Sequence, residues 1–265
     1  MMTHPLCLDF LTAVEASPPE LATLAAANGC QSISFMVHPV QGVPDFGLSS
    51  DTPMRRETKQ RCADLGVGVD MVEGFLLTSE VDVAAFAPSL ESAAWLGALS
   101  ANVVLRDSDA AQLAESFTAF RDLASSFGIV TLAEWSRRTC FASPAAIHDF
   151  LAAVGKDALL QVDFLHVNRG GYGPADIAEL APAIVARGQI SDGPAEMPVD
   201  QQFAEAIGGR LFPGDGALPL KDFIEALPDG RVIGVEVPNT ALKDQGMSAD
   251  ERVRRAVAGV KRLLA

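Results

Sequence analysis

Basic residues are scarce in this chain of 265 residues. Lys and Arg together number 20 against 34 Asp and Glu, which gives a formal net charge of −14 at pH 7. A surface with this balance repels the phosphate backbone of nucleic acids, so nucleic acid is excluded as a partner. Histidine is also rare, with four residues, and this disfavours sites that need several imidazole ligands.

Long apolar runs and paired cysteines are missing as well. No run reaches the 18 or more residues that a membrane span requires, and the N-terminal stretch has no basic segment followed by a long apolar one, so it does not resemble a signal peptide. The four cysteines are scattered, without a CxxC pair. These absences predict a cytoplasmic protein with reduced, inert thiols and no membrane partner.

Glycine-rich phosphate-binding motifs are absent too, because neither GxGxxG nor GxxxxGK[ST] occurs. What is present is a regular alternation of short apolar runs and helical stretches, which predicts a parallel sheet. The predicted strands are 5–11, 32–37, 66–72, 101–105, 129–134, 159–164, 184–191 and 232–237. Eight strand–helix units without a linker predict one domain over 1–265, an α/β fold of the (β/α)8 TIM-barrel type.

Helix punctuation supports this pattern. The stretch 143–155 begins with Ser143 as a cap and Pro144 at the first helical position, and it ends at Gly155. The last helix opens with a capping box from Ser248 to Glu251. The segment 193–219, after the seventh strand, is longer than an ordinary connection, so we expect it to form a loop over the substrate.

Acidic or amide side chains stand at the ends of four successive strands: Glu134, Asp163, Gln189 and Glu236. The C-terminal ends of parallel barrel strands converge on one mouth, so these oxygen donors are expected to form a strongly negative pocket. Such a cluster is costly unless a cation neutralises it. A set of oxygen ligands favours one divalent ion of Mg2+, Mn2+ or Co2+ over Zn2+.

Several motifs resemble the xylose-isomerase-like TIM-barrel superfamily, the sugar phosphate isomerase/epimerase group. The similar stretches are LAEW around Glu134, VDFLHVNRGG (162–171), GQISDGP (188–194) and FPGDGALPLKDFIEAL with VIGVEVPN within 212–239. The superfamily includes ketose 3-epimerases, inosose dehydratases, 3-dehydroshikimate dehydratases and endonuclease IV. The first hundred residues match it only in strand–helix rhythm and in DMVEGF (70–75).

The resemblance implies roles for particular residues. It places the metal ligands on Glu134, Asp163, Gln189 and Glu236, with Gln189 where the superfamily has histidine, as in the 3-dehydroshikimate dehydratase branch. It implies that His166, three residues after Asp163, contacts substrate oxygen or transfers protons. Arg169, in the same loop, is then a candidate for binding the substrate. From the strand pattern itself, His38 and Glu73 follow the second and third strands and are further substrate-binding candidates.

The expected chemistry is metal-assisted proton transfer next to a carbonyl, through an enediolate. In an isomerase or epimerase, Glu134 and Glu236 would exchange the proton on opposite faces of a keto sugar, a sugar phosphate or a related polyol. In a dehydratase, one base would remove the proton and His166 would assist loss of water, which makes the protein a lyase. A non-catalytic sugar-binding relative is a third alternative, and an endonuclease IV-like activity is disfavoured by the acidic charge. The expected partner is a small sugar or hydroxy-keto acid, and a homo-oligomer is left open.

Overall fold

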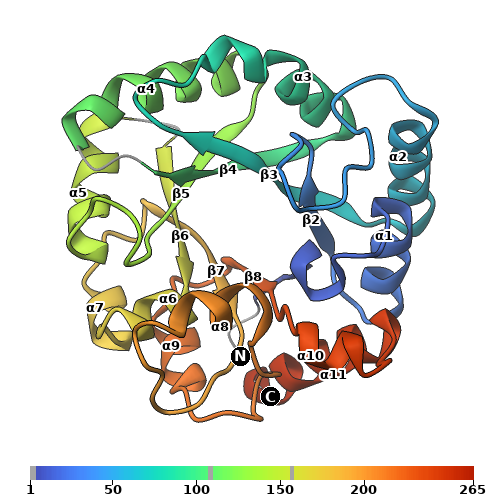
Figure 1. The fold of residues 1–265 in the computed structure, drawn as a ribbon, viewed down its shortest axis with the longest axis vertical. Coiled ribbons are helices and arrows are strands. Elements are labelled where there is room, and N and C mark those ends of the chain that lie inside the picture. The colour runs from blue at the N-terminus through green and yellow to red at the C-terminus, as the bar shows by residue number, and fades with distance from the viewer. Residues whose placement is uncertain (1–3, 107–109, 156–157) are drawn as a thin grey trace.

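Eight parallel strands close into a barrel in the computed structural model, which describes residues 4–106, 110–155 and 158–265. Each strand pairs with the next one along the chain, and β8 pairs with β1 to complete the ring (Figure 1). The strands are β1 (Leu6–Leu8), β2 (Ser32–Met36), β3 (Gly68–Leu77), β4 (Ala98–Leu105), β5 (Val130–Glu134), β6 (Ala158–Asp163), β7 (Val185–Ile190) and β8 (Val232–Val235). The predicted (β/α)8 TIM barrel is therefore confirmed, and each of the eight strands overlaps its predicted range.

Helices surround the barrel and bury its outer face (Figure 1). The α-helices are α1 (Pro18–Ala27), α2 (Pro53–Leu65), α3 (Ala87–Leu96), α4 (Ala110–Ser126), α5 (Pro144–Val154), α6 (Phe164–Arg169), α7 (Pro174–Ala178), α8 (Gln202–Gly208), α9 (Leu220–Ala226), α10 (Thr240–Asp244) and α11 (Ala249–Leu264). Two 3-10 helices are η1 (Phe10–Ala13) and η2 (Val83–Phe86). No described helix is long and apolar enough to cross a membrane.

The helix ends follow the local sequence signals. Ser143 accepts a hydrogen bond from the backbone of Ala146 at the start of α5, and Ser248 does the same for Glu251 at the start of α11. Each bond satisfies one of the backbone N–H groups that a helix N-terminus leaves without a partner. Both predicted helix starts are confirmed.

Strand β3 is longer than the predicted range 66–72 and extends to Leu77. Its register with β4 shifts between Val72 and Phe75, and the bulge is built on Gly74 at φ +110°. A Cβ atom at Gly74 would lie 2.2 Å from the carbonyl oxygen of His38, so only glycine fits there. As a result, Glu73 lies inside the strand and not at its end, which corrects the predicted boundary.

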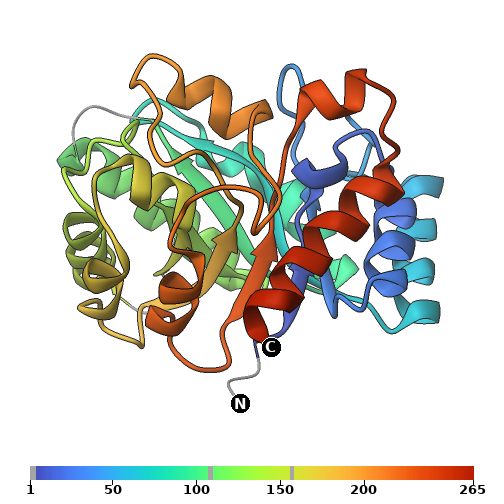
Figure 2. The same cartoon turned by 90° about the horizontal axis from the view of Figure 1, so that it is seen from below.

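The long segment after β7 forms α8, which lies on the side of the barrel to which the strands point (Figure 2). Two buried carboxylates anchor it. Asp192 accepts hydrogen bonds from the backbone N–H groups of Gly193, Gly214, Gly216 and Leu218. Glu205 of α8 forms a bidentate ion pair with Arg169 of α6, at 2.6 and 2.7 Å. The insertion is therefore fixed over the mouth of the barrel.

Candidate active site

The predicted strand-end residues meet inside the mouth of the barrel because neighbouring strands hold them in register. Asp163 of β6 pairs with Gln189 of β7, and Gln189 pairs in turn with Gly234, two residues before Glu236. Residues two apart on a strand face the same side. Glu134 likewise pairs with Gln161 of β6. This register brings the four side chains together, as expected.

A chain of amide hydrogen bonds joins the carboxylates around the barrel. Gln161 Nε2 donates to Gln189 Oε1 at 2.9 Å and lies 3.4 Å from Glu134 Oε2. Gln189 Nε2 donates to Glu236 Oε1 at 3.1 Å and to Asp9 Oδ2 at 2.8 Å. Because Gln189 faces two carboxylates, its amide N–H groups point toward them as donors. Its amide oxygen accepts the hydrogen bond from Gln161.

Arg210 is the residue that sequence reasoning missed and that organises the mouth. Its Nη1 donates to Asp163 Oδ2 at 2.7 Å, and its Nη2 lies 3.1 Å from Glu236 Oε2. Its side chain is only 3% exposed, so both ion pairs lie in a low-dielectric environment where they are strong. A guanidinium therefore bridges two of the four residues predicted to share a metal ion.

The backbone holds Arg210 in this position. Arg210 follows α8, and short bridges tie its neighbours to the loops after β7 and β8, pairing Leu211 with Asp192 and Gly209 with Asn239. Its Nε donates to the carbonyl of Ala206 at 2.8 Å. The ion-pair geometry is thus set by the fixed insertion over the mouth and not by a free side chain.

The carboxyl groups of the mouth differ in protonation behaviour. Burial, followed by the charge of Asp163, raises the pKa of Glu134 well above its usual value. Burial also raises the pKa of Glu236 to about 7, although Arg210 opposes the shift. Burial acts in the same direction on Asp163, but Arg210, His166 and two hydrogen bonds lower the pKa of Asp163 overall. One carboxylate is therefore held ionised while two others can carry a proton near neutral pH.

His166 lies next to Glu134, on the first turn of α6. Its backbone N–H and that of Leu165 donate to Asp163 Oδ1, which caps the helix. Its Nε2 is 3.4 Å from Glu134 Oε1 and 3.9 Å from Asp163 Oδ2. Burial lowers the pKa of His166, so the imidazole is neutral at pH 7.

Three residues of the mouth fit a divalent cation. Glu134, Asp163 and His166 each offer one ligand atom, and these atoms all lie within 4.8 Å of one another. Oε1 of Glu134 is buried and has no hydrogen-bond partner, so a cation would satisfy it. Gln189 and Glu236 share a hydrogen bond, Gln189 also accepts one from Gln161, and Glu236 is paired with Arg210. Their predicted role as metal ligands therefore requires these contacts to break.

The remaining predicted site residues lie at different depths. Glu73 is inside the barrel, lines the mouth cavity and lies 3.4 Å from Ser34 Oγ. Arg169 is buried and donates hydrogen bonds to Glu205, to Asn168 and to the carbonyl of Pro194. Its guanidinium group therefore anchors α8. His38 does not line the described cavities of the mouth. Its Nδ1 is 3.0 Å from Ser89 Oγ, and its ring packs edge-on against Phe86.

No protein-family model matches this sequence, and no curated protein matches it significantly. Solved structures do match it over almost the whole chain. A xylose isomerase domain protein from Alicyclobacillus acidocaldarius is 21% identical, with a TM-score of 0.77 over 99% of this chain and 98% of that one. The chain has the fold of the xylose isomerase-like TIM barrels.

Two further structures with this fold carry descriptions of their reactions. D-allulose 3-epimerase from Methylomonas sp., solved with D-allulose, is 14% identical, with a TM-score of 0.72 over 99% of this chain and 98% of that one. The probable 3-DHS dehydratase AsbF from Bacillus anthracis is 14% identical, with a TM-score of 0.74 over 97% and 98%. At this identity the comparisons establish the fold and leave the reaction to the site.

A second buried cluster lies deeper in the barrel, below the mouth. Arg187 of β7 donates from Nη2 to both oxygens of Asp9, at 2.9 Å, and its Nη1 lies 3.4 Å from Asp70 Oδ2. Gly234 makes room for it, since a Cβ atom there would lie 2.0 Å from Arg187 Nη2 and 2.1 Å from Asp9 Oδ2. Gln189 joins this cluster to the mouth through its bond to Asp9.

Proposed function

We propose that the mouth of the barrel catalyses proton transfer next to a carbonyl in a small hydroxy-keto substrate, as an isomerase or epimerase of this fold. The observation that carries the proposal is that Glu134 and Glu236, both with raised pKa, line one cavity of 220 Å³ together with His166 and Arg210. General acid–base catalysis is most effective when the pKa of the group lies near the working pH.

Two carboxyls are needed for inversion at carbon. One removes the proton from one face of the substrate, and the other returns a proton to the opposite face. Glu134 reaches the cavity from β5 and Glu236 from the end of β8, so they approach it from different sides of the barrel. Arg210 stays charged because burial is outweighed by Asp163 and Glu236, which raise its pKa. It supplies a fixed positive charge beside the negative charge that develops on the substrate oxygen.

A divalent cation would be held by Glu134, Asp163 and His166, and when bound it would polarise the substrate carbonyl as a Lewis acid. Whether or not an ion is present, the chain's own residues have separate tasks. Asp163 orients His166 by capping α6 and fixes Arg210. Gln161 and Gln189 hold the carboxyl groups of Glu134 and Glu236 in place.

A dehydratase is the second candidate, and one observation favours it. His166 Nε2 lies 3.4 Å from Glu134 Oε1, so a base and a proton carrier stand side by side on the same edge of the cavity. This pair could take a proton from carbon and deliver one to a departing β-hydroxyl group. The dehydratase AsbF, which shares the fold, is consistent with this alternative.

The experiment is solvent exchange with a panel of keto sugars, inososes, dehydroshikimate and 2-oxo acids in D2O, with and without Mn2+. An isomerase or epimerase incorporates deuterium at the carbon next to the carbonyl, because the enediolate is reprotonated by groups that exchange with solvent. A dehydratase forms a conjugated carbonyl that absorbs in the near ultraviolet. Binding of a panel member without exchange or elimination would contradict both candidates and indicate a non-catalytic binding protein.

A further inference from the structure

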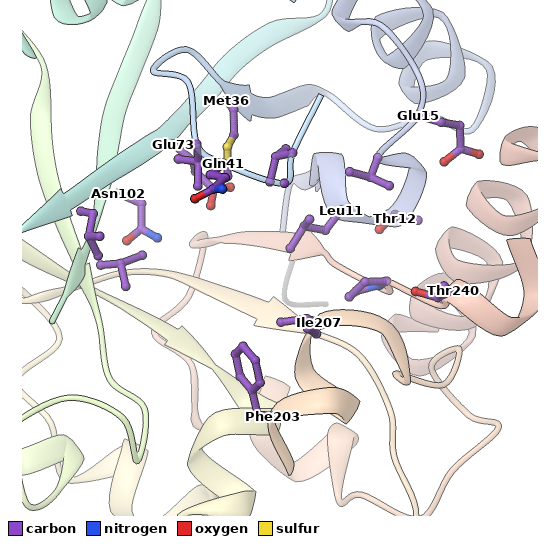
Figure 3. Close-up of a pocket in the computed structure, with 18 of the residues that line it drawn as sticks. Leu11, Thr12, Glu15, Met36, Gln41, Glu73, Asn102, Phe203, Ile207 and Thr240 are labelled. Carbon is purple, nitrogen blue, oxygen red and sulfur yellow. The ribbon is translucent and has the colours of Figure 1, made fainter. Parts of the chain in front are cut away.

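A large apolar chamber opens beside the catalytic cavity. It has a volume of 540 Å³, and its walls include Leu11, Val14, Met36, Val43, Phe203 and Ile207. Figure 3 shows Phe203 and Ile207 on one side of this space and Leu11 and Met36 on the other. Leu11, Met36, Phe203 and Ile207 also line the catalytic cavity, so the two spaces are continuous.

Three polar residues of the chamber wall already bond within the protein. Thr12 Oγ1 donates to the carbonyl of Val235 and accepts from the N–H of Val237. Glu15 is paired with Arg252. Asn239 donates to the carbonyl of Arg210 and caps α10. These groups have little capacity left for hydroxyl groups of a ligand.

The other polar lining residues differ in burial, because Gln41, Thr240 and Lys243 are exposed, whereas Asn102 and Glu73 lie at the end of the chamber next to the catalytic cavity. Asn102 Oδ1 is buried without a hydrogen-bond partner, and burial raises the pKa of Glu73 well above its usual value, which favours the neutral form of Glu73. A sugar with hydroxyl groups along its whole length would lose bonds to water in the chamber without replacing them. An apolar arm would lose none and would bury its surface.

Two arginines lie where the chamber and the catalytic cavity meet, and Arg106 lines both spaces. Arg106 and Arg138 line the catalytic cavity together with Glu134 and His166. Burial and the charge of Arg138 lower the pKa of Arg106, so the two guanidinium groups act on each other as neighbouring like charges. Arg138 also lies over the ring of Phe203, 3.9 Å from its centroid. Two arginines that face one cavity attract an anion, and planar guanidinium groups match a carboxylate.

We propose that the substrate is a hydroxy- or 2-oxo-carboxylic acid with an aliphatic or aromatic arm. Its carboxylate binds between Arg106 and Arg138, its carbonyl lies over Glu134 and His166, and its arm fills the chamber between Leu11 and Ile207. This inference rests on the proposed function and names the class of molecule on which it acts. The proposed substrate is thus an amphipathic acid and not a free sugar, which is polar along its whole length.

The test is calorimetric binding of pyruvate, 2-oxopentanoate, 4-methyl-2-oxopentanoate and D-fructose to the full chain. Affinity should rise along the three acids, by roughly tenfold or more from the first to the last, because each added methyl or methylene group is buried. D-fructose should bind no more tightly than pyruvate. Equal affinity for the three acids, or tighter binding of D-fructose, would overturn the inference.

Exposed residues of the chamber allow variants that fold. Ile207 is 56% exposed and Phe203 is 45% exposed, so neither is needed for the core. Ile207→Asn should weaken binding of 4-methyl-2-oxopentanoate at least about fivefold and change that of pyruvate less than about twofold. Val199→Asn is the matched control, because Val199 is 65% exposed in the same insertion but does not line the chamber, and it should change neither. Equal effects of the two variants would contradict the assignment of the arm.

Arg138→Gln tests the other end of the substrate. This substitution should weaken the binding of all three acids by a similar factor and leave the binding of D-fructose unchanged, since only the contact with the carboxylate is lost. An unchanged affinity for the acids would overturn this contact.

Deuterium incorporation at C3 of 4-methyl-2-oxopentanoate, compared between the natural chain and Glu134→Gln, separates the two proposals. Arm-dependent binding without exchange contradicts the proposed function alone, and exchange without arm-dependent binding contradicts the inference alone.

Discussion

Two clusters of buried charge stand one above the other in this barrel, and they differ in their balance. In the lower cluster, Arg187 faces Asp9 and Asp70 and is closed off from solvent. In the mouth, Arg210 pairs with Asp163 and Glu236, while Glu73 and Glu134 line the same cavity and pair with no arginine in the described part of the chain. The lower cluster has two carboxyls for one arginine, whereas the upper one has four carboxyls around Arg210 and therefore the larger excess of acid.

This difference separates stability from reactivity. An arginine partner favours the charged form of a buried carboxylate, as Arg187 does for Asp70, although burial still raises the pKa of Asp70 overall. Carboxyls in excess of their partners share protons, and their pKa values move toward neutrality, as Glu236 illustrates with a pKa of about 7. The same residue types thus support the fold at one level and chemistry at the next.

The largest effect should come from removing one of the excess carboxyls. Glu134→Gln should lower deuterium exchange by roughly 10²–10⁴-fold, because a general base is lost. Its unfolding free energy should stay close to that of the natural chain. Asp70→Asn in the lower cluster is the control, with exchange expected within a few-fold. If both variants lower exchange equally, the division between the two clusters is wrong.

Removing the lower arginine should mainly affect stability. Arg187→Met leaves Asp9 buried without its cation, and breaking a buried ion pair in this way costs about 3–5 kcal/mol. Urea denaturation followed by circular dichroism would measure the loss. A second substitution, Asp9→Asn, should recover part of it, since it removes the stranded charge. A loss below about 1 kcal/mol would show that the lower cluster does not stabilise the fold.

The excess acid of the mouth should also make stability depend on pH. The pKa of Glu236 is raised from 4.5 in the unfolded chain to about 7 in the folded one, with burial as its first cause. Its favourable contribution is therefore complete below pH 4.5 and is lost as the pH rises through about 7. Glu236→Gln has no such proton to lose. Over this pH interval, the unfolding free energy of Glu236→Gln should therefore increase relative to that of the natural chain by on the order of 2–3 kcal/mol.

Urea titrations of both proteins at several pH values between these limits would measure the difference. A constant difference across the interval would contradict the raised pKa of Glu236. Asp163 gives the opposite sign, since its pKa is lowered in the folded chain, and stability due to Asp163 is lost as the pH falls.

The smallest predicted effect concerns metal binding. Arg210 and a divalent ion both compete for Asp163 Oδ2, so Arg210→Met should bind Mn2+ about tenfold more tightly in calorimetry. Mn2+ should also raise its melting temperature more than that of the natural chain. Arg187→Met, which keeps the three candidate ligands, should bind Mn2+ as tightly as the natural chain does. An unchanged affinity in Arg210→Met would mean that the ion and the arginine occupy separate places.

The barrel itself was accessible from the sequence because strand–helix alternation and capping residues are local signals. The convergence of Glu134, Asp163, Gln189 and Glu236 was accessible for the same reason, since the ends of parallel strands must meet. The boundary of β3 was not, because the bulge at Gly74 depends on the carbonyl of His38, which lies in the loop after β2. Metal ligation by Gln189 and Glu236, and the substrate roles of His38 and Arg169, stay predictions.

The missed residues differ in how visible they were. Asp9 lies inside the predicted first strand, 5–11, which in the structure ends at Leu8, so the strand-end pattern did not reveal Asp9. Arg187 lies within an apolar strand, and a charge buried on a strand implies a partner across the barrel. Arg210 carried no such signal. Its importance follows from the fold of the insertion after β7, which places it 47 positions along the chain from Asp163 against that carboxylate.

The anchoring of α8 has a consequence for how this protein can change over evolutionary time. Asp192 and Glu205 hold the insertion, and Arg210 is held by its neighbours' backbone, so none of these contacts uses Phe203 or Ile207. Mutations at Ile207 can therefore accumulate without disturbing the framework or the reactive groups, whereas those at Phe203 also remove its contact with Arg138. Substitutions in the insertion therefore offer a route by which relatives of this chain acquire a different substrate preference while they retain the same chemistry.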